Sequence, residues 1–287
     1  MTMESFRTAF LLAALSLATL LAACAAPQPV APAAPEKPKT AVAATPAFDH
    51  AALDQLLAAR VNNGGWVDYK GLRADRAKLD AYLNTLATAD PAAMAGDAER
   101  LAFWINAYNG FTLADALDEI HGKRAGVKGI DETFFRGKKH RVAGQELTLD
   151  QIERNGRDLK DPRIHFAVVC ASASCPKLQS FAYTGAQLHE QLDNAAREFL
   201  ADTARGMRLD RERRRVILSP IFKWYAADFT GGAALLARAK AQLSGGEILE
   251  YVRKYAAADD AQFIAERNPT VDYLEYDWSL NAQETHP

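Results

Sequence analysis

Two cysteines and a histidine lie close together in residues 165–178, "HFAVVCASASCPKL". An apolar run leads from His165 to Cys170, and a loop that contains serines leads on to Cys175. The only other cysteine in the chain is Cys24. Paired cysteines form disulfides in oxidising compartments, whereas a cysteine with a histidine in reach is the minimum for thiol acyl transfer. The residues therefore leave open a Cys170–Cys175 disulfide or a nucleophilic thiol.

Cys175 is the candidate nucleophile. Pro176 is a natural first residue of a helix, which predicts that Cys175 is the N-cap, where the positive end of the helix dipole favours a thiolate. His165 is the candidate base. Asp277, near the end of the chain, is the candidate that orients the imidazole.

The segment "RIHFAVVC", residues 163–170, is apolar and β-branched and predicts a buried strand. Side chains alternate between the two faces of a strand, so His165 and Cys170 are expected on opposite faces. Five steps of ~3.3 Å also separate these two residues by ~16 Å. A direct His165–Cys170 pair is therefore not expected. Cys170 is expected to be a buried small side chain or half of a disulfide.

Further polar residues are candidates for the lining of a cleft. Asn106 and Asn109 are one helical turn apart, share a face, and need hydrogen-bond partners. They are expected to brace buried loop backbone, or else to line the cleft, where Asn106 would stabilise an oxyanion. Glu153, Ser172 and Ser174 are further candidates for this cleft, although Glu153 also fits a surface charge.

Several classes of site lack support in the sequence. There is no C-x-x-C or H-E-x-x-H spacing, so no metal site is expected. Nucleotide-binding glycine motifs and the G-x-S-x-G motif of serine hydrolases are missing as well, and no cofactor is expected. The formal net charge of −2, with acids and bases interspersed, argues against nucleic-acid binding.

The elements that must position these residues are mostly helices. Apolar residues at helical spacing and capping patterns predict helices. Thr148 with Gln151 and Thr184 with Gln187 form two capping-box patterns, and Ser219 before Pro220 predicts an N-cap. The predicted helices cover residues 49–61, 76–90, 97–120, 149–159, 185–202 and 221–229.

Short strands are predicted between these helices. Residues 138–148 predict a hairpin that turns at Ala143–Gly144, and residues 66–69, "WVDY", predict a short strand. The basic run "RERRR", residues 211–215, predicts a solvated turn between two strands, and the segment from Thr270 predicts another strand. These elements predict an α+β fold, with a small mixed sheet surrounded by many helices.

The N-terminus predicts export and lipid anchoring. Residues 1–23 have the form of a signal peptide and end before Cys24 in Leu-Ala-Ala-Cys, which resembles a bacterial lipobox; an ordinary secretory signal is the alternative. Residues 24–47 predict a lipidated cysteine and an Ala/Pro-rich tether. Residue 25 is not Asp, which favours the periplasmic side of the outer membrane. Residues 48–281 predict one globular domain, and residues 282–287 a tail.

Three stretches together carry a resemblance to a known family: "FWINAYNGFTL" (103–113), "IHFAVVCASASCPKL" (164–178) and "YLEYDWSLN" (273–281). With "LTLDQIE" and "LSPIFKWYAADF" in the same order, residues 48–281 resemble the family known as domain of unknown function 547. The resemblance implies an exported bacterial member and carries no established activity. A helix packed on a small sheet with His and Asp is also similar in broad layout to papain-like and transglutaminase-like hydrolases.

Two functions follow as expectations. The first is an outer-membrane lipoprotein that acts as a thiol-dependent hydrolase or acyltransferase on peptide-like substrates, with Cys175, His165, Asp277 and Asn106 as its site. The second is a non-catalytic module that binds a peptide or glycan and is stapled by a Cys170–Cys175 disulfide. In both, the partners are the lipid bilayer, through acylated Cys24, and a ligand of the cell envelope.

Overall fold

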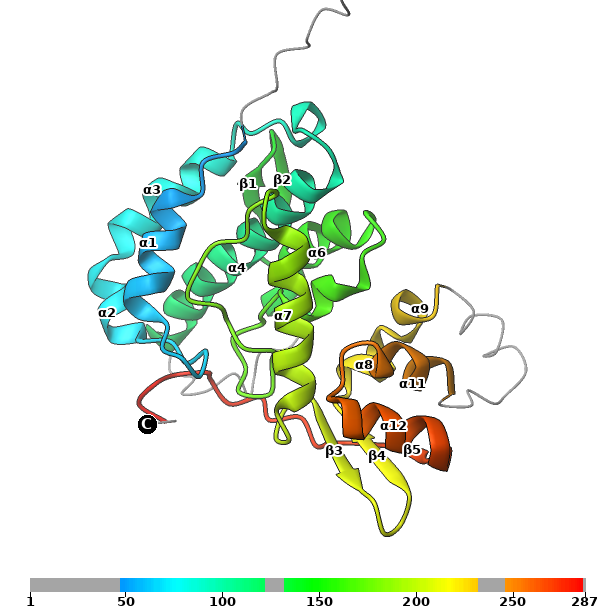
Figure 1. Ribbon diagram of the computed structural model, residues 1–287. Helices are drawn as coiled ribbons and strands as arrows, with labels where there is room; N and C mark the ends of the chain where they lie inside the picture. Colours follow the sequence, from blue (N-terminus) through cyan, green and yellow to red (C-terminus); the bar gives the residue numbers. More distant parts are fainter. Residues whose placement is uncertain (1–46, 122–131, 232–245, 286–287) are drawn as a thin grey trace, which may run out of the picture. The chain divides into compact units, whose positions relative to one another are not determined.

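Eleven α-helices, two 3-10 helices and two small sheets make up the part of the chain that the structure describes (Figure 1). This computed structural model describes residues 47–121, 132–231 and 246–285. The α+β fold predicted from the sequence is confirmed. Cys24, the signal peptide and nearly all of the tether lie outside the described residues. The helices are α1 (Ala51–Arg60), α2 (Tyr69–Ala74), α3 (Arg76–Leu86), α4 (Asp97–His121), α5 (Glu132–Arg136), α6 (Leu149–Arg157), α7 (Leu188–Ala201), α8 (Ile221–Trp224), α9 (Ala226–Phe229), α11 (Gly246–Arg253) and α12 (Ala258–Arg267), with the 3-10 helices η1 (Pro91–Ala93) and η2 (Pro162–Phe166).

Helix α4 is the central element of the larger hydrophobic core. Every residue from Leu101 to Leu117 is buried, so this helix is covered on all sides. It packs against α3, α6 and α7, and α6 is its most extensive neighbour. The helix predicted over residues 97–120 is confirmed, and the structure shows in addition that its central part is buried.

The two sheets are short and separate. Strands β1 (His140–Val142) and β2 (Gln145–Leu147) form the predicted hairpin. Its turn residues Ala143 and Gly144 both have positive φ angles, of 52° and 71°. Such a pair is typical of a type I′ turn, which matches the twist of the strands.

The second sheet is mixed and has the order β3–β4–β5. Strands β3 (Met207–Asp210) and β4 (Arg215–Leu218) are antiparallel, and β5 (Thr270–Tyr273) joins β4 in parallel. Residues 211–214 of the basic run form the predicted exposed turn between β3 and β4, and Arg215 is the first residue of β4. This sheet packs with α7, α8, α9, α11 and α12 in a second hydrophobic core that contains Phe166, Phe199 and Phe222.

The predicted strand over residues 163–170 is wrong. Its first part is the 3-10 helix η2, which begins at Pro162, and the side chain of Asp161 caps it by accepting the backbone N–H of Arg163. Beyond η2, the backbone of Ala167 and Val169 bonds to the side chain of Asn109 rather than to a neighbouring strand. A strand needs a partner for its backbone groups, and an apolar run alone does not supply one.

Two further predictions also need correction. No helix begins at Pro176, so Cys175 is not a helix N-cap and gains no helix dipole. Within residues 66–69 only Val67 makes β-bridges, because Asp68 caps α2 by accepting the N–H of Gly71.

The capping patterns had mixed outcomes. Thr148 and Gln151 form the predicted capping box of α6. Helix α7 begins only at Leu188, without a side-chain cap, so the box predicted from Thr184 is wrong. Pro220 rather than Ser219 is the N-cap of α8, and the hydroxyl of Ser219 accepts the N–H of Ile221 at 3.4 Å.

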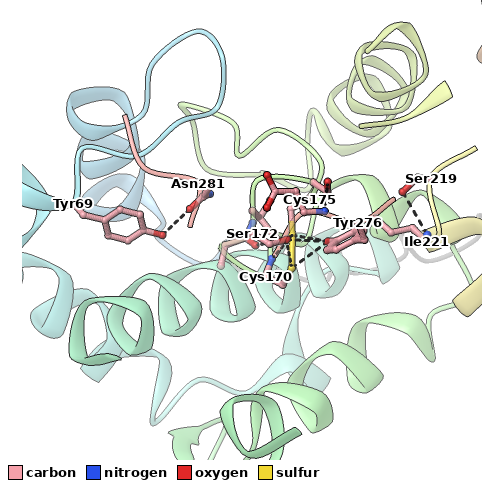
Figure 2. Close-up of a disulfide and its surroundings, with 12 residues drawn as sticks. Tyr69, Cys170, Ser172, Cys175, Ser219, Ile221, Tyr276 and Asn281 are labelled. Atoms are coloured by element: carbon pink, nitrogen blue, oxygen red, sulfur yellow. Dashed lines mark hydrogen bonds between the residues drawn. A yellow bond between two sulfur atoms is a disulfide. The ribbon is translucent and has the colours of Figure 1, made fainter. Parts of the chain in front are cut away.

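The C-terminal segment returns across the cysteine-containing loop. Ala173 N donates to Ser279 O at 2.7 Å, and Asn281 N donates to Ala171 O at 3.0 Å. Asn281 is fixed in turn by the hydroxyl of Tyr69, which donates to its side chain at 2.8 Å (Figure 2). These hydrogen bonds fix the backbone of the cysteine-containing loop to the C-terminal segment. They also bring the aromatic residues of that segment beside the loop.

Candidate functional site

A cavity of about 220 Å³ lies beside the cysteine-containing loop. Its walls are mainly aromatic, with a few charged groups and both sulfur-bearing residues of the loop. Segments far apart in the sequence contribute to it: α4, α5, α6, η2, the loop, α8 and the C-terminal segment. The lining residues are Tyr108, Phe135, Arg136, Asp150, Glu153, His165, Val168, Cys170, Cys175, Pro176, Ile221, Trp224, Tyr225, Tyr276 and Trp278.

Cys170 and Cys175 are joined by a disulfide (Figure 2). Cys175 is buried, with 3 % exposure, whereas Cys170 is partly exposed. The hydroxyls of Ser172 and Tyr276 lie against both sulfurs, at 3.2 and 3.3 Å from Sγ of Cys175. The bonded sulfur of Cys175 is not available as a nucleophile in this state.

His165 is held by Asp228 and not by Asp277. Its Nε2 lies 2.8 Å from Oδ2 of Asp228, and the ring of Tyr225 stacks on the imidazole with centroids 4.0 Å apart. Burial lowers the pKa of His165, although Asp228 opposes this shift. Burial would raise the pKa of Asp228, but hydrogen bonds from His165 and Arg157 outweigh it and hold that pKa well below its usual value. A neutral imidazole beside a carboxylate is the expected state at neutral pH.

The side chain of Asp277 lies with the loop. Its carboxylate accepts the N–H of Ser279 at 2.8 Å, and its backbone N–H donates to the hydroxyl of Ser174 at 2.8 Å. Asp228 therefore occupies the position that the sequence analysis gave to Asp277. The order of residues along the chain could not show which acid holds His165, because Asp228 and Asp277 both follow it.

Asn106 and Asn109 brace the backbone of two loops. The amide of Asn106 donates to Tyr183 O at 2.7 Å and accepts Tyr183 N–H at 2.9 Å. Asn109 bridges Ala167 O and Val169 N–H in the same way, at 2.9 Å each. Neither asparagine lines the cavity. Both ends of Asn106 are occupied, so its predicted role as an oxyanion stabiliser has no support in this arrangement.

Glu153 does line the cavity. Its atom Oε1 is buried and has no hydrogen-bond partner among the described residues. Burial raises the pKa of Glu153 to about 6, although a hydrogen bond with Tyr225 opposes the shift. The group therefore offers a ligand a carboxyl oxygen that titrates near neutral pH.

Ser172 and Ser174 support the loop and are not part of the cavity lining. The hydroxyl of Ser172 donates to that of Tyr276 at 3.0 Å. Ser174 receives the backbone N–H of Asp277. The two serines thus connect the disulfide loop to the C-terminal segment.

Three aromatic side chains form the rim of the cavity. Trp224 is 49 % exposed, and its ring lies 5.8 Å from that of Trp278 and 4.9 Å from that of Tyr276. The rings of Tyr276 and Trp278 are 4.4 Å apart. Exposed aromatic clusters beside a cavity are typical of binding sites, because such rings bury a large area at a low entropic cost.

Residues 47–121, 132–231 and 246–285 contain neither a metal-binding cluster nor a helix that could span a membrane. No group of three or more His, Cys, Asp or Glu side chains there is arranged to hold a metal ion. In these same ranges no helix is both long enough and apolar enough to cross a membrane.

A family model described as "Protein of unknown function, DUF547" matches residues 91–200. This match supports a DUF547 family domain over these residues. This DUF547 segment includes the first two of the three stretches that carried the resemblance, and it ends before the third. Extension of the family to residue 281 stays a prediction. Comparison with curated proteins and with solved structures finds no match.

Several residues of the site were not predicted from the sequence, and five of them lie beyond the DUF547 match. They lie in the stretches "LSPIFKWYAADF" and "YLEYDWSLN", which had been noted only for their resemblance. The density of aromatic residues beside single acids was the available signal. The five residues beyond the match are Trp224, Tyr225, Asp228, Tyr276 and Trp278.

Proposed function

We propose that this protein is a lipid-anchored envelope protein whose globular part binds a peptide or glycan in the cavity walled by the Cys170–Cys175 disulfide. The observation that carries the proposal is the cavity itself. It joins an aromatic rim, in which Trp224 is exposed, to an inner carboxyl group, Glu153, that has a buried oxygen without a partner among the described residues. The anchoring part of the proposal is supported by residues 1–24 of the sequence alone.

The size of the cavity supports a small recognition unit. At about 220 Å³ it is below the ~300–1,000 Å³ that is usual for sites of drug-sized ligands. A single sugar ring, or one or two residues of a peptide, matches this volume better than a large cofactor. Trp224 and Trp278 offer flat faces to the ligand, while Glu153 offers a hydrogen-bond acceptor.

Thiol-dependent hydrolysis has less support. It requires a free Cys175, whose sulfur is bonded to Cys170, and a base aimed at that sulfur. The Nε2 atom of His165 is bonded to Asp228 instead. The second function of the sequence analysis, a non-catalytic module stapled by this disulfide, therefore agrees better with the geometry.

The proposal is tested with soluble fragments of bacterial cell wall, whose glycan and peptide parts cover both ligand chemistries. Calorimetric titration of the purified full chain should detect binding, and Trp224→Ala should weaken it by tenfold or more, about 1.4 kcal/mol. Tyr273→Ala is the matched control, because Tyr273 is the other large exposed aromatic among the described residues and does not line the cavity. An absence of binding to the glycan fragments and to the peptide fragments would refute the proposal.

A further inference from the structure

The two cysteines of the disulfide differ in exposure. Both cysteines line the cavity, but Cys170 is partly exposed and Cys175 is 3 % exposed. Cys170 is thus the more exposed of the two cysteines that a thiol in the cavity can meet. Attack on one defined sulfur requires that the other sulfur can leave as a thiolate.

Hydrogen-bond donors surround the sulfur that would leave. The backbone N–H of Cys170 donates to Sγ of Cys175 at 3.0 Å. The hydroxyl of Tyr276 lies 3.3 Å from the same sulfur, and Ser172 donates to Tyr276 at 3.0 Å (Figure 2). Ser172, with its single O–H, also lies 3.2 Å from Sγ of Cys175, so either hydroxyl can donate to that sulfur. Both hydroxyls also lie 3.1 and 3.4 Å from Sγ of Cys170, so the backbone N–H of Cys170 is the donor that distinguishes Cys175. Donors aimed at a sulfur stabilise its thiolate, and a stable thiolate is a good leaving group.

The loop does not depend on the disulfide for its position. Its backbone is held by Ser279 and Asn281 of the C-terminal segment, and Val169, just before Cys170, is held by Asn109. The bond joins residues only five positions apart, so it restricts little of the unfolded chain. Opening of the bond therefore leaves the fold and the cavity in place.

We propose that Cys170–Cys175 is a redox-active disulfide that exchanges with the paired thiols of a cysteine-containing peptide or protein. A thiolate of the partner attacks Sγ of Cys170 and forms a mixed disulfide. The Cys170–Cys175 bond breaks, and its electron pair stays on Cys175 as a thiolate. The second thiolate of the partner then attacks its own sulfur in the mixed disulfide and releases Cys170.

The exchange balances without a further reactant. The partner loses two electrons and two protons and gains a disulfide, and Cys170 and Cys175 become two thiols. The reverse sequence oxidises the reduced protein. The inference goes beyond ligand binding and does not depend on which glycan or peptide unit the cavity holds.

Single cysteine variants test the predicted asymmetry. Full-chain Cys175→Ser keeps the exposed Cys170 thiol, and Cys170→Ser keeps the buried Cys175 thiol. With oxidised glutathione as the probe, we expect Cys175→Ser to form a mixed disulfide at least tenfold faster than Cys170→Ser under native conditions, as measured by intact mass. Equal rates, or a faster Cys170→Ser variant, would overturn the proposal.

A second measurement uses the intact wild-type disulfide, so its outcome does not depend on whether the cysteine variants fold. Reduced glutathione should open Cys170–Cys175 in the native protein. Tyr276→Phe should slow this opening by roughly threefold, because it removes a hydrogen-bond donor from the sulfur that leaves as a thiolate. Tyr273→Phe, outside the cavity, should leave the rate unchanged. Reduction that occurs only after denaturation, or a Tyr276→Phe rate equal to that of the wild type, would contradict the inference.

Discussion

Replacement of Asn109 by Ala should destabilise the protein strongly, although this residue touches neither the disulfide nor the cavity. Its side chain accepts the N–H of Val169 and donates to the carbonyl of Ala167, both at 2.9 Å. Asn109 itself is 3 % exposed, so no water takes over these two bonds. The variant therefore leaves one buried donor and one buried acceptor without partners.

The expected loss of stability follows from these two groups. Each buried backbone group that loses its partner costs about 1–3 kcal/mol, so the variant should lower the free energy of unfolding by roughly 2–4 kcal/mol, with some relaxation of the loop. Urea denaturation, followed by far-UV circular dichroism, measures this loss as a shift of the unfolding midpoint with an unchanged m-value. The segment from Ala167 to Val169 also joins His165 to Cys170, so the variant should loosen the cavity wall as well.

Asn194→Ala is the matched control. Asn194 also lies on a long helix, but it is exposed, and its bond to Arg197 is a surface contact. The control should change the free energy of unfolding by less than about 0.5 kcal/mol. A loss below about 1 kcal/mol for Asn109→Ala would show that Asn109 does not brace the loop and would refute the reasoning.

Three further predictions concern burial, backbone conformation and anchoring. Burial raises the pKa of Glu153 from 4.5 to about 6, so the contribution of this group to stability is fully present below pH 4.5 and is lost as the pH rises through 6. Glu153→Gln should therefore stabilise the protein at pH 7 by up to about 2 kcal/mol and make its free energy of unfolding less dependent on pH. An unchanged dependence on pH would contradict the burial of this group. Arg214 is exposed and has a φ angle of 51°, so Arg214→Gly should raise the free energy of unfolding by roughly 0.5–1 kcal/mol. Glu212→Gly in the same turn should lower it. Thermal unfolding measures both variants, and effects of the same sign and size would contradict the turn geometry. Cys24→Ser should move the protein from the membrane fraction to the soluble periplasm, and a variant that still sediments with membranes would exclude lipid anchoring through Cys24.

Elements with strong local signals could be predicted from the sequence. The long helix α4 has an apolar pattern over its whole length, and the β1–β2 hairpin has the Ala143–Gly144 turn that its twist requires. The Thr148–Gln151 capping box fixed the start of α6 because both halves of its hydrogen-bond pattern lie within four residues. In each case the decisive interactions are local.

The site depended on contacts that no local pattern contains. The segment at 163–170 resembled a strand, but Asn109, which is distant in the sequence, bonds to its backbone instead. The loss of the strand also removed the argument that separated His165 from Cys170, because both now line one cavity. The choice of Asp228 over Asp277 depends on the packing of α9 against η2 and was equally hidden from the sequence.

The central claim, that the cavity beside the disulfide binds a ligand, is tested most directly by the indole signals of the protein's four tryptophans in a ¹H–¹⁵N spectrum. Trp224 and Trp278 line the cavity, while Trp66 and Trp104 lie outside its lining and serve as internal controls. Addition of cell-wall glycan and peptide fragments should shift the signals of Trp224 and Trp278 in a saturable manner and leave those of Trp66 and Trp104 in place. Signals that all stay fixed at saturating fragment concentrations, or a shift confined to Trp66 and Trp104, would contradict the claim.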